Sequence, residues 1–319
     1  MSTEVQRGTL SSDIVIPKRK SILSKLWRDR YLYVLLLPGL VYFLVFKYVP
    51  MWGVLLAFKD YQPFLGFFRS PWVGLQNFQV FFENPDFLRL MRNTLILSLL
   101  NIVFFFPAPI VLALMLNEIR KSFYKRTIQT IVYLPHFMSM VIIASITYVF
   151  LTTDGGLVNQ LLQQTTGHQI PFLTSEAWFR PMITLQTIWK ETGWGTILFL
   201  AALAGVDTQL YEAAVIDGAG RWRQMWHVTL PAIRPVIIVL LILRMGSVLD
   251  NGFEQIYLMT NSLNRSVADV YDTYVYFVGI TQGSFSYSTA VGLFKSVVGA
   301  VLIFASNWIA KKSGQGGIF

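Results

Sequence analysis

Long apolar stretches separated by shorter polar segments run through the chain from residue 31 onward. The six strongest cover residues 31–46, 94–116, 128–151, 182–204, 236–249 and 289–310. Most of them approach or exceed the roughly 20 residues with which a helix crosses about 30 Å of hydrocarbon. Lipid offers no hydrogen-bond partners to backbone groups, and the stretches lack the alternation of barrel strands, so they must be helical. The pattern predicts an all-α membrane protein with six transmembrane helices.

Charged residues interrupt the first and fifth of these helices, at Lys47 and Arg244. We expect each helix to continue past its charge, the first through residues 51–58 and the fifth through residues 253–259. The first stretch begins only at Tyr31 and is followed by Lys47 and Tyr48 rather than by a small-residue cleavage site. It is therefore expected to remain as a membrane anchor and not to be removed as a signal peptide.

The composition agrees with a membrane protein. Hydrophobic residues make up 54% of the 319 residues and charged residues 13%, against roughly 25% charged residues in ordinary soluble domains. Such a chain has too little polar surface for a water-soluble fold. It contains no cysteine, which excludes disulfides and thiol chemistry.

The net charge of +9 reflects an uneven distribution of basic residues along the chain. The richer segments lie before the first stretch and after the second, fourth and sixth: Lys18, Arg19, Lys20, Lys25, Arg28, Arg30, Arg120, Lys121, Lys125, Arg126, Arg221, Arg223, Arg234, Lys311 and Lys312. The alternate loops hold only Arg69, Arg89, Arg92, Arg180 and Arg265. This positive-inside pattern predicts that both termini are cytoplasmic. The basicity is thus a topology signal and gives little support to nucleic-acid binding.

The same topology divides the chain into segments with different expected roles. Residues 1–30 form a cytoplasmic tail with an interfacial helix at residues 22–27, and residues 31–319 form the membrane domain. We expect outer loops at residues 59–92, 152–181 and 251–288. In the first, a short helix starting at Pro85 is expected to pack on the membrane surface. The aromatic run of the third loop, Tyr271, Tyr274, Tyr276 and Phe277, is expected at the membrane interface.

A cytoplasmic loop at residues 205–235 joins the fourth and fifth apolar stretches. Asp207 is a plausible N-cap for a short helix at residues 210–216, and Gly218 and Gly220 allow a sharp corner. A second short helix is expected at residues 221–228. We expect Pro231 to end it and Pro235 to begin the fifth transmembrane helix. An exposed helical elbow with apolar and basic side chains indicates a surface that fits the groove of a partner protein.

This segment resembles the EAA loop of the membrane subunits of bacterial ATP-binding-cassette (ABC) importers. Glu212, Ala213, Ala214, Gly218, Leu230 and Pro231 match that loop in identity and spacing, and Val228 stands where the family has isoleucine. The resemblance implies a coupling helix that sits in a cleft of a separate ATPase subunit. It assigns coupling to Glu212, Ala213, Ala214, Asp217, Gly218, Ala219, Arg221, Trp222, Arg223, Trp226, Leu230 and Pro231.

The resemblance extends to segments outside the loop, at residues 33–39, 46–61, 73–78, 93–94, 189–195 and 269–276. These are similar to the carbohydrate-importing branch of the family, above all to permeases for complex oligosaccharides such as the lipoprotein-associated type and the first membrane subunit of the alginate importer. The resemblance implies the type I ABC importer permease fold in the bacterial inner membrane. It also implies two ATPase subunits, a second and different permease subunit, and a periplasmic or lipid-anchored solute-binding protein as partners.

No signature of an enzyme is found in the sequence. The segment from Gly292 to Ser296 lacks the glycine that precedes lysine in a phosphate-binding loop. His136, His168 and His227 lie on separate segments, so no metal site is expected. ATP and magnesium are therefore expected only on partner subunits. An ion-coupled secondary transporter, which needs no ATPase, and a membrane enzyme remain the alternatives.

Charged residues within the apolar stretches bear on which substrate is transported. A charge near the bilayer centre costs at least about 2.5 to 3.5 kcal/mol and normally faces the interior of the bundle. One alternative is structural pairing, in which Arg244 or Lys295 pairs with Asp250 or Glu254. The other is a path that favours an acidic oligosaccharide. The candidate path residues are Lys47, Asn101, Tyr148, Trp189, Arg244, Asn251, Glu254, Gln255, Tyr257 and Lys295.

Overall fold

The computed structural model describes residues 27–312. The predicted tail, and its interfacial helix at residues 22–27 apart from Trp27, lie outside that range. The chain divides into two compact units, residues 1–53 and residues 54–319. Within residues 27–312 the regular structure is helical, and the only strand-like pairing there is an isolated antiparallel bridge between Lys59 and Trp72. The predicted all-α class is confirmed.

The described part of the first unit is a single helical run. It begins as α2 (Arg30–Phe43), passes through the π-helical turn η1 (Leu44–Tyr48), and enters the 3-10 segment η2 (Val49–Phe58), which extends into the second unit. The whole run is 29 residues long and apolar enough to span a membrane. Its continuation past Lys47 to residue 58 was predicted and is confirmed. Every residue from Arg30 to Trp52 is exposed.

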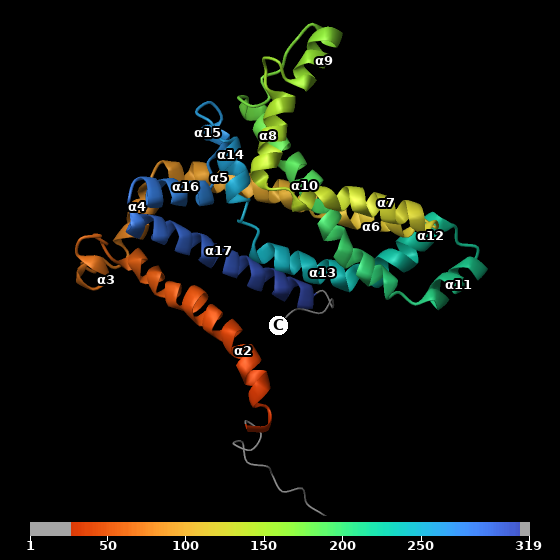
Figure 1. Ribbon diagram of the computed structural model, residues 1–319, viewed down its shortest axis with the longest axis horizontal. Helices are drawn as coiled ribbons and strands as arrows, with labels where there is room; N and C mark the ends of the chain where they lie inside the picture. Colours follow the sequence, from red (N-terminus) through yellow and green to blue (C-terminus); the bar gives the residue numbers. More distant parts are fainter. Residues whose placement is uncertain (1–26, 313–319) are drawn as a thin grey trace, which may run out of the picture. The chain divides into compact units, whose positions relative to one another are not determined.

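The second unit contains the remaining helices (Figure 1). In chain order they are α3 (Gly66–Arg69), α4 (Gln76–Glu83), α5 (Asp86–Leu100), η3 (Asn101–Phe105), α6 (Pro107–Asn117), α7 (Ser122–Tyr133), η4 (Leu134–Phe137), α8 (Met140–Leu151), α9 (Leu157–Thr166), α10 (Glu176–Ala204), α11 (Thr208–Ile216), α12 (Arg221–Gln224), η5 (Met225–Thr229), α13 (Leu230–Gly246), α14 (Phe253–Met259), α15 (Arg265–Ala268), α16 (Tyr271–Tyr276), η6 (Phe277–Thr281) and α17 (Phe285–Lys312).

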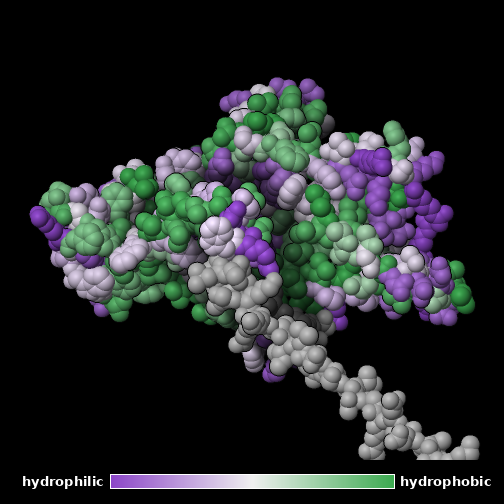
Figure 2. All heavy atoms as spheres, turned by 60° about the horizontal axis from the view of Figure 1, so that its bottom comes forward, coloured by the Kyte–Doolittle hydropathy of each residue, from purple (hydrophilic) through white to green (hydrophobic). Residues whose placement is uncertain are grey.

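The described helices provide six candidate membrane spans when two bent pairs are each counted as one. The four that qualify as single helical runs are Arg30–Phe58, Asp86–Asn117, Arg221–Gly246 and Phe285–Lys312. The bent pairs are Ser122–Phe137 with Met140–Leu151, at 100°, and Glu176–Ala204 with Thr208–Ile216, at 71°. Figure 2 shows broad hydrophobic areas on the visible face, with hydrophilic side chains concentrated toward the side where Figure 1 places α11 and α12. The described helices thus provide four to six candidate spans, a range that includes the predicted six.

Close helix contacts in the second unit depend on small residues. A Cβ atom added to Gly193 of α10 would lie 1.9 Å from the backbone oxygen of Val132, so glycine is required where α10 crosses α7. The Thr196 hydroxyl donates to the backbone oxygen of Pro109 at 3.3 Å and ties α10 to α6. At the crossing of α13 and α17, a Cβ on Gly299 would lie 3.2 Å from the oxygen of Gly246. These contacts hold the spans around the pockets described below.

Three predicted helix boundaries in the fifth span are wrong. Helix α13 ends at Gly246, and α14 begins only at Phe253 after an irregular segment in which Gly252 has a φ of +81°. The segment includes the polar residues Ser247, Asp250 and Asn251, and the left-handed conformation of Gly252, which favours glycine, directly precedes α14. At the other end, Pro231 does not end the second elbow helix and Pro235 does not begin the span, because Arg221–Gly246 is one helical run that contains both prolines. The π-helical turn η5 precedes Pro231 and accommodates its missing N–H.

Three further expectations were too simple. The helix that starts after Pro85 is the beginning of the span Asp86–Asn117 and not a separate surface helix. The third apolar stretch is broken by the bend between η4 and α8, where the Ser139 hydroxyl caps α8 by accepting from the N–H of Ile142. Tyr271 is 2% exposed and packs against Phe81 in a core cluster rather than lying at the membrane interface. Burial raises the pKa of the Tyr271 hydroxyl to about 12.

Candidate translocation pocket and coupling elbow

The elbow between α10 and α13 has the local geometry that the sequence predicts for its first helix. The Asp207 carboxylate accepts from the N–H of Gln209 at 2.9 Å and caps α11. Gly218 turns the chain with a φ of +72°, which allows the N–H of Ala219 to donate to the oxygen of Ala214 at 2.8 Å. The Gln224 amide then donates to the oxygen of Ala219 at 2.7 Å and joins α12 to the corner. The corner is thus a defined structure and not an irregular loop.

The surface of this elbow is apolar and uncovered. Ile216 is 86% exposed, Trp222 is 73% exposed and Trp226 is 59% exposed. Arg221 and Arg223 are exposed beside them, and Arg221 has only a 4.0 Å contact with Glu118. Of the predicted coupling residues, Ala214, Ala219 and Leu230 are half-buried, and Glu212, Ala213, Asp217, Gly218, Arg221, Trp222, Arg223, Trp226 and Pro231 are exposed. Large exposed apolar side chains rimmed by charge are typical of a protein interaction surface.

A cavity of about 340 Å³, called the Arg244 pocket here, gathers five of the ten predicted path residues. They come from η3, from the end of α13, from the irregular segment 247–252 and from α14: Asn101, Arg244, Asn251, Glu254 and Gln255. The other lining residues are Met140, Thr187, Lys190, Glu191, Asp250, Gly252 and Phe253. Those from α8 and α10 were not predicted, since nothing in the local sequence shows that these helices face the break after α13.

Arg244 makes no direct ion pair among residues 27–312, although the carboxylates of Glu191, Asp250 and Glu254 line the same pocket. Its Nε atom is buried without a hydrogen-bond partner, and its guanidinium lies 5.6 Å from the ring centre of Phe105. Asp250 instead pairs with Lys295 at 2.5 Å, and Glu254 is exposed. The predicted alternative of structural pairing therefore does not hold for Arg244. Arg244 thus lines the pocket without a direct ion-pair partner among the described residues.

Asn251 and Gln255 use their amides within the protein. The Asn251 side chain donates to the backbone oxygen of Thr94 at 3.1 Å and accepts from the Ser98 hydroxyl at 3.3 Å. The Gln255 side chain donates at 2.9 Å to the oxygens of both Ile183 and Gln186, and accepts from Thr187 at 3.1 Å. Both residues are nearly inaccessible. They fix the break after α13 against α5 and α10, which positions Arg244 and Glu254.

A second charged cluster lies at the bend before α8. Lys190 donates to the backbone oxygen of His136 at 2.8 Å and pairs with Glu191 at 3.2 Å. The other oxygen of Glu191 lies 2.8 Å from Nδ1 of His136, whose ring stacks on Trp194 with centroids 4.4 Å apart. Lys190 and Glu191 thus neutralise each other and brace the bend. Their charges are not free for a ligand.

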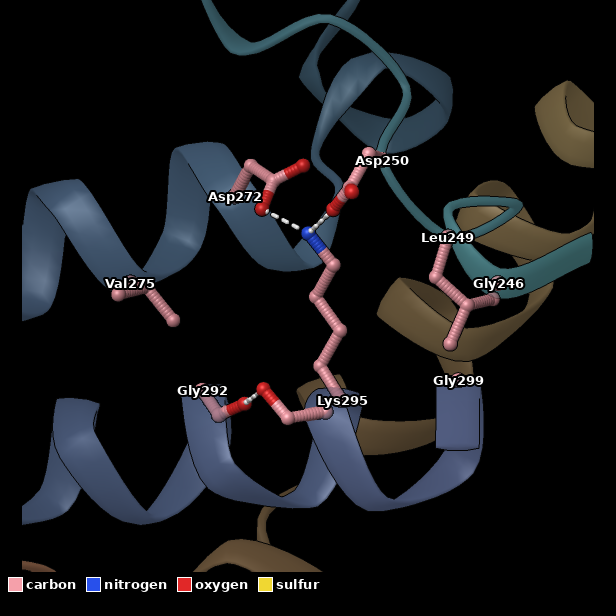
Figure 3. A pocket seen from close by; sticks show the side chains of 9 residues that line it. Gly246, Leu249, Asp250, Asp272, Val275, Gly292, Lys295 and Gly299 are labelled. Carbon is pink, nitrogen blue, oxygen red and sulfur yellow. Dashed lines mark hydrogen bonds and ion pairs between the residues drawn. The ribbon is translucent and has the colours of Figure 1, made fainter. Parts of the chain in front are cut away.

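Lys295 occupies a neighbouring cavity of about 370 Å³, which we call the Lys295 pocket (Figure 3). Its ammonium group lies between two carboxylates, Asp272 of α16 and Asp250 of the segment after α13. The pairing of Lys295 with Asp250 is one of the predicted alternatives and is confirmed. Asp272 was not predicted, because it belongs to a short helix whose packing on α17 has no local sequence signal.

The remaining predicted path residues lie outside these two pockets. Trp189 lines an apolar cavity of about 430 Å³ between α8, α9 and α10. Tyr148 donates to the backbone oxygen of Leu258 at 3.5 Å. Tyr257 stacks on Phe253 at 5.4 Å and borders a cavity of about 540 Å³ near α15. Lys47 belongs to the first unit. Within residues 27–312, no group of three or more His, Asp or Glu side chains could hold a metal ion.

The comparisons identify the family. Residues 105–315, about two thirds of the chain, match the family described as binding-protein-dependent transport system inner membrane component. The chain belongs to this family. Members of this family are transport permeases, and both the elbow and the two pockets lie within the matched residues, except for Asn101 at the edge of the Arg244 pocket.

Two relatives and one solved structure extend the match to nearly the whole chain. Protein LplB of Bacillus subtilis (strain 168) is 67% identical over 299 residues, which cover 94% of each chain. The polygalacturonan/rhamnogalacturonan transport system permease protein YteP of the same organism is 57% identical over 302 residues, covering 95% of this chain and 94% of YteP. A crystal structure of a bacterial alginate ABC transporter with an alginate pentasaccharide-bound periplasmic protein contains a chain with a TM-score of 0.85 at 40% identity. The match covers 93% of this chain and 99% of that one. The predicted ABC importer permease fold is confirmed.

Proposed function

We propose that this permease carries an acidic oligosaccharide, of the uronate-containing kind, across the plasma membrane into the cytoplasm by alternating access. The sugar passes the Arg244 pocket, and separate ATPase subunits, which bind ATP and magnesium, drive the cycle through the elbow at residues 212–231. A solute-binding protein delivers the sugar to the outer side. Both pectin-like and alginate-like chains are consistent with this proposal, since each presents a carboxylate on every uronate unit.

The observation that carries the proposed cargo is the position of Arg244, which lines the pocket without a direct ion pair among the described residues. A guanidinium within a membrane span is costly and is retained where it has a functional partner. Arginine also matches a carboxylate with two parallel hydrogen bonds, which makes it the preferred side chain for binding such a group. The names of YteP and of the alginate transporter, both of which concern acidic polysaccharides, support the same class of substrate for this chain.

The exposed elbow supports ATP coupling. Ile216, Trp222 and Trp226 form an apolar patch that a partner must cover to remove it from water. A tryptophan at such a centre is typical of residues that dominate binding energy. The short helix α11, capped by Asp207 and ended by Gly218, supplies a rigid knob for a cleft in the ATPase. Movement of the ATPase would then be transmitted along the unbroken helical run Arg221–Gly246 to Arg244.

The first unit supports a second permease subunit as partner. The helical run from Arg30 to Trp52 is apolar around its circumference, apart from Arg30, Lys47 and the hydroxyl groups of Tyr33, Tyr42 and Tyr48. An apolar span of this kind is covered in the membrane by lipid or by another helix. We propose that the second permease, a different chain, contributes to that cover.

The proposal is tested by replacing Arg244 in the reconstituted complex of this chain with its second permease, ATPases and binding protein. Trigalacturonate and the same trisaccharide with its carboxylates reduced to alcohols form a matched pair of substrates. Arg244→Gln should raise the half-saturating concentration of trigalacturonate about tenfold or more, because a charge-assisted hydrogen bond contributes about 1.5–3 kcal/mol. Arg244→Lys, which keeps the charge, should lose less. An equal loss for both substrates would contradict the role of Arg244 in recognising a carboxylate.

A further inference from the structure

Asp250 has an unusual position, since it lines both the Arg244 pocket and the Lys295 pocket. Its carboxylate contacts the Lys295 ammonium at 2.5 Å from one side, and the Asp272 carboxylate contacts the same ammonium from α16 (Figure 3). One ammonium therefore has two carboxylate partners. Either carboxylate alone would neutralise the Lys295 ammonium, so Lys295 does not need both.

The two carboxylates differ in how firmly they are held. The Asp250 side chain is 63% exposed, whereas that of Asp272 is 23% exposed and that of Lys295 is 14% exposed. An exposed ion pair contributes little because water competes for both charges, whereas a sheltered one is costly to break. Asp272 is thus the fixed partner of Lys295, and Asp250 is the partner that can be displaced.

The backbone around Asp250 does not need to move for this displacement. Its neighbour Asn251 is bound to Thr94 and Ser98 of α5, and the N–H of Asp250 donates to the oxygen of Ser247 at 2.9 Å. These bonds hold the segment in place while the exposed carboxylate remains free to rotate. Rotation of one side chain would open the Lys295 ammonium to the Arg244 pocket.

We propose that Asp250 is an internal competitor for the substrate's carboxylate. When no acidic sugar is present, Asp250 occupies the second carboxylate position on Lys295. A uronate carboxylate that enters from the Arg244 pocket takes that position, Asp250 turns away into water, and Lys295 and Arg244 bind successive acidic units. A neutral sugar has no carboxylate to replace that of Asp250 on Lys295, so the exchange favours the binding of acidic sugars. This inference rests on the function proposed above.

The test compares Asp250→Asn with Asp272→Asn in the reconstituted complex. The two substitutions remove the same charge from the same ammonium and differ in the exposure of the residue. Asp250→Asn should lower the half-saturating concentration of trigalacturonate, relative to its carboxyl-reduced form and to wild type, about two- to fivefold, which is the range of an exposed ion pair. Asp272→Asn should not lower it, because Asp250 then becomes the only counter-ion of Lys295. Because the same binding protein is used with every variant, dividing each variant's substrate preference by that of wild type removes the binding protein's own preference for one substrate.

The double variant Lys295→Gln with Asp272→Asn tests whether the Lys295 ammonium contributes to the recognition of acidic sugar. It removes one positive and one negative charge together, so no sheltered charge is left without a partner. It should reduce the preference for trigalacturonate over the carboxyl-reduced form. Equal gains for the two aspartate variants, no gain for Asp250→Asn, or an undiminished preference in the double variant would each overturn the inference. If wild type takes up trigalacturonate in an Arg244-dependent manner while Asp250→Asn has no effect, only this inference fails. If wild type shows no such uptake, the proposed function fails.

Discussion

Replacement of Gly218 by alanine tests the elbow with a single methyl group. Gly218 has a φ of +72°, and a Cβ atom built on it meets nothing within 4 Å. The substitution therefore adds no clash, and its cost is that of placing an L-residue in the left-handed region, about 1–2 kcal/mol. If the substitution destabilises the conformation of the corner that binds the ATPase by this amount, the population of that conformation falls roughly 5- to 30-fold.

Gly220 offers a matched control two residues away. It has a φ of −66°, which any residue adopts, and a Cβ on it also meets nothing within 4 Å. We expect Gly218→Ala to reduce sugar-stimulated ATP hydrolysis and co-purification of the ATPase, and Gly220→Ala to stay near wild type in both measurements. Membrane insertion should be normal for both, because neither residue lies in an apolar span. Equal behaviour of the two variants would refute the argument that the left-handed corner presents α11 to the ATPase.

Two further substitutions test the docking surface and the packing of the bundle. Trp222→Ala should weaken association with the ATPase about 30-fold, since a tryptophan at the centre of an interface commonly contributes 2 kcal/mol or more to binding. Phe68→Ala, which removes an 89% exposed aromatic side chain from α3, is the control and should leave association unchanged. Gly193→Ala should lower the melting temperature of the purified complex markedly, because the added Cβ would lie 1.9 Å from the Val132 oxygen. Gly292→Ala in α17, whose added Cβ meets nothing within 4 Å, is the control and should not lower it. Equal melting temperatures would contradict the tight crossing of α10 and α7.

The spans and the first half of the elbow could be predicted because their signals are local. Twenty apolar residues in lipid have few alternatives to a helix, and Asp207 caps α11 through bonds made within two residues. The break before α8 was missed because the apolar stretch 128–151 runs through it. The break after α13 was missed although Asp250, Asn251 and Gly252 interrupt the apolar pattern there. They depend on a serine cap and on a left-handed glycine, whose effects apolar periodicity does not reveal.

The candidate site was predicted in part for the same reason. Charged and amide side chains in apolar stretches indicated which residues face the interior, and Arg244, Glu254, Asn251 and Gln255 do meet in one pocket. Sequence could not distinguish an amide that binds a ligand from one whose hydrogen bonds are used internally. Nor could it place Asp272 beside Lys295, since that contact depends on how α16 packs on α17. Long-range packing therefore decides which polar residues are free.

The most direct measurement of the central claim is uptake of radiolabelled trigalacturonate by vesicles containing the complete complex. ATP is supplied on the side of the elbow, and the sugar and its binding protein on the other. The proposed function predicts uptake that requires ATP hydrolysis, persists when proton and sodium gradients are collapsed, and falls sharply in Arg244→Gln. Uptake that proceeds without ATP and follows an imposed ion gradient would contradict it and would favour a secondary transporter.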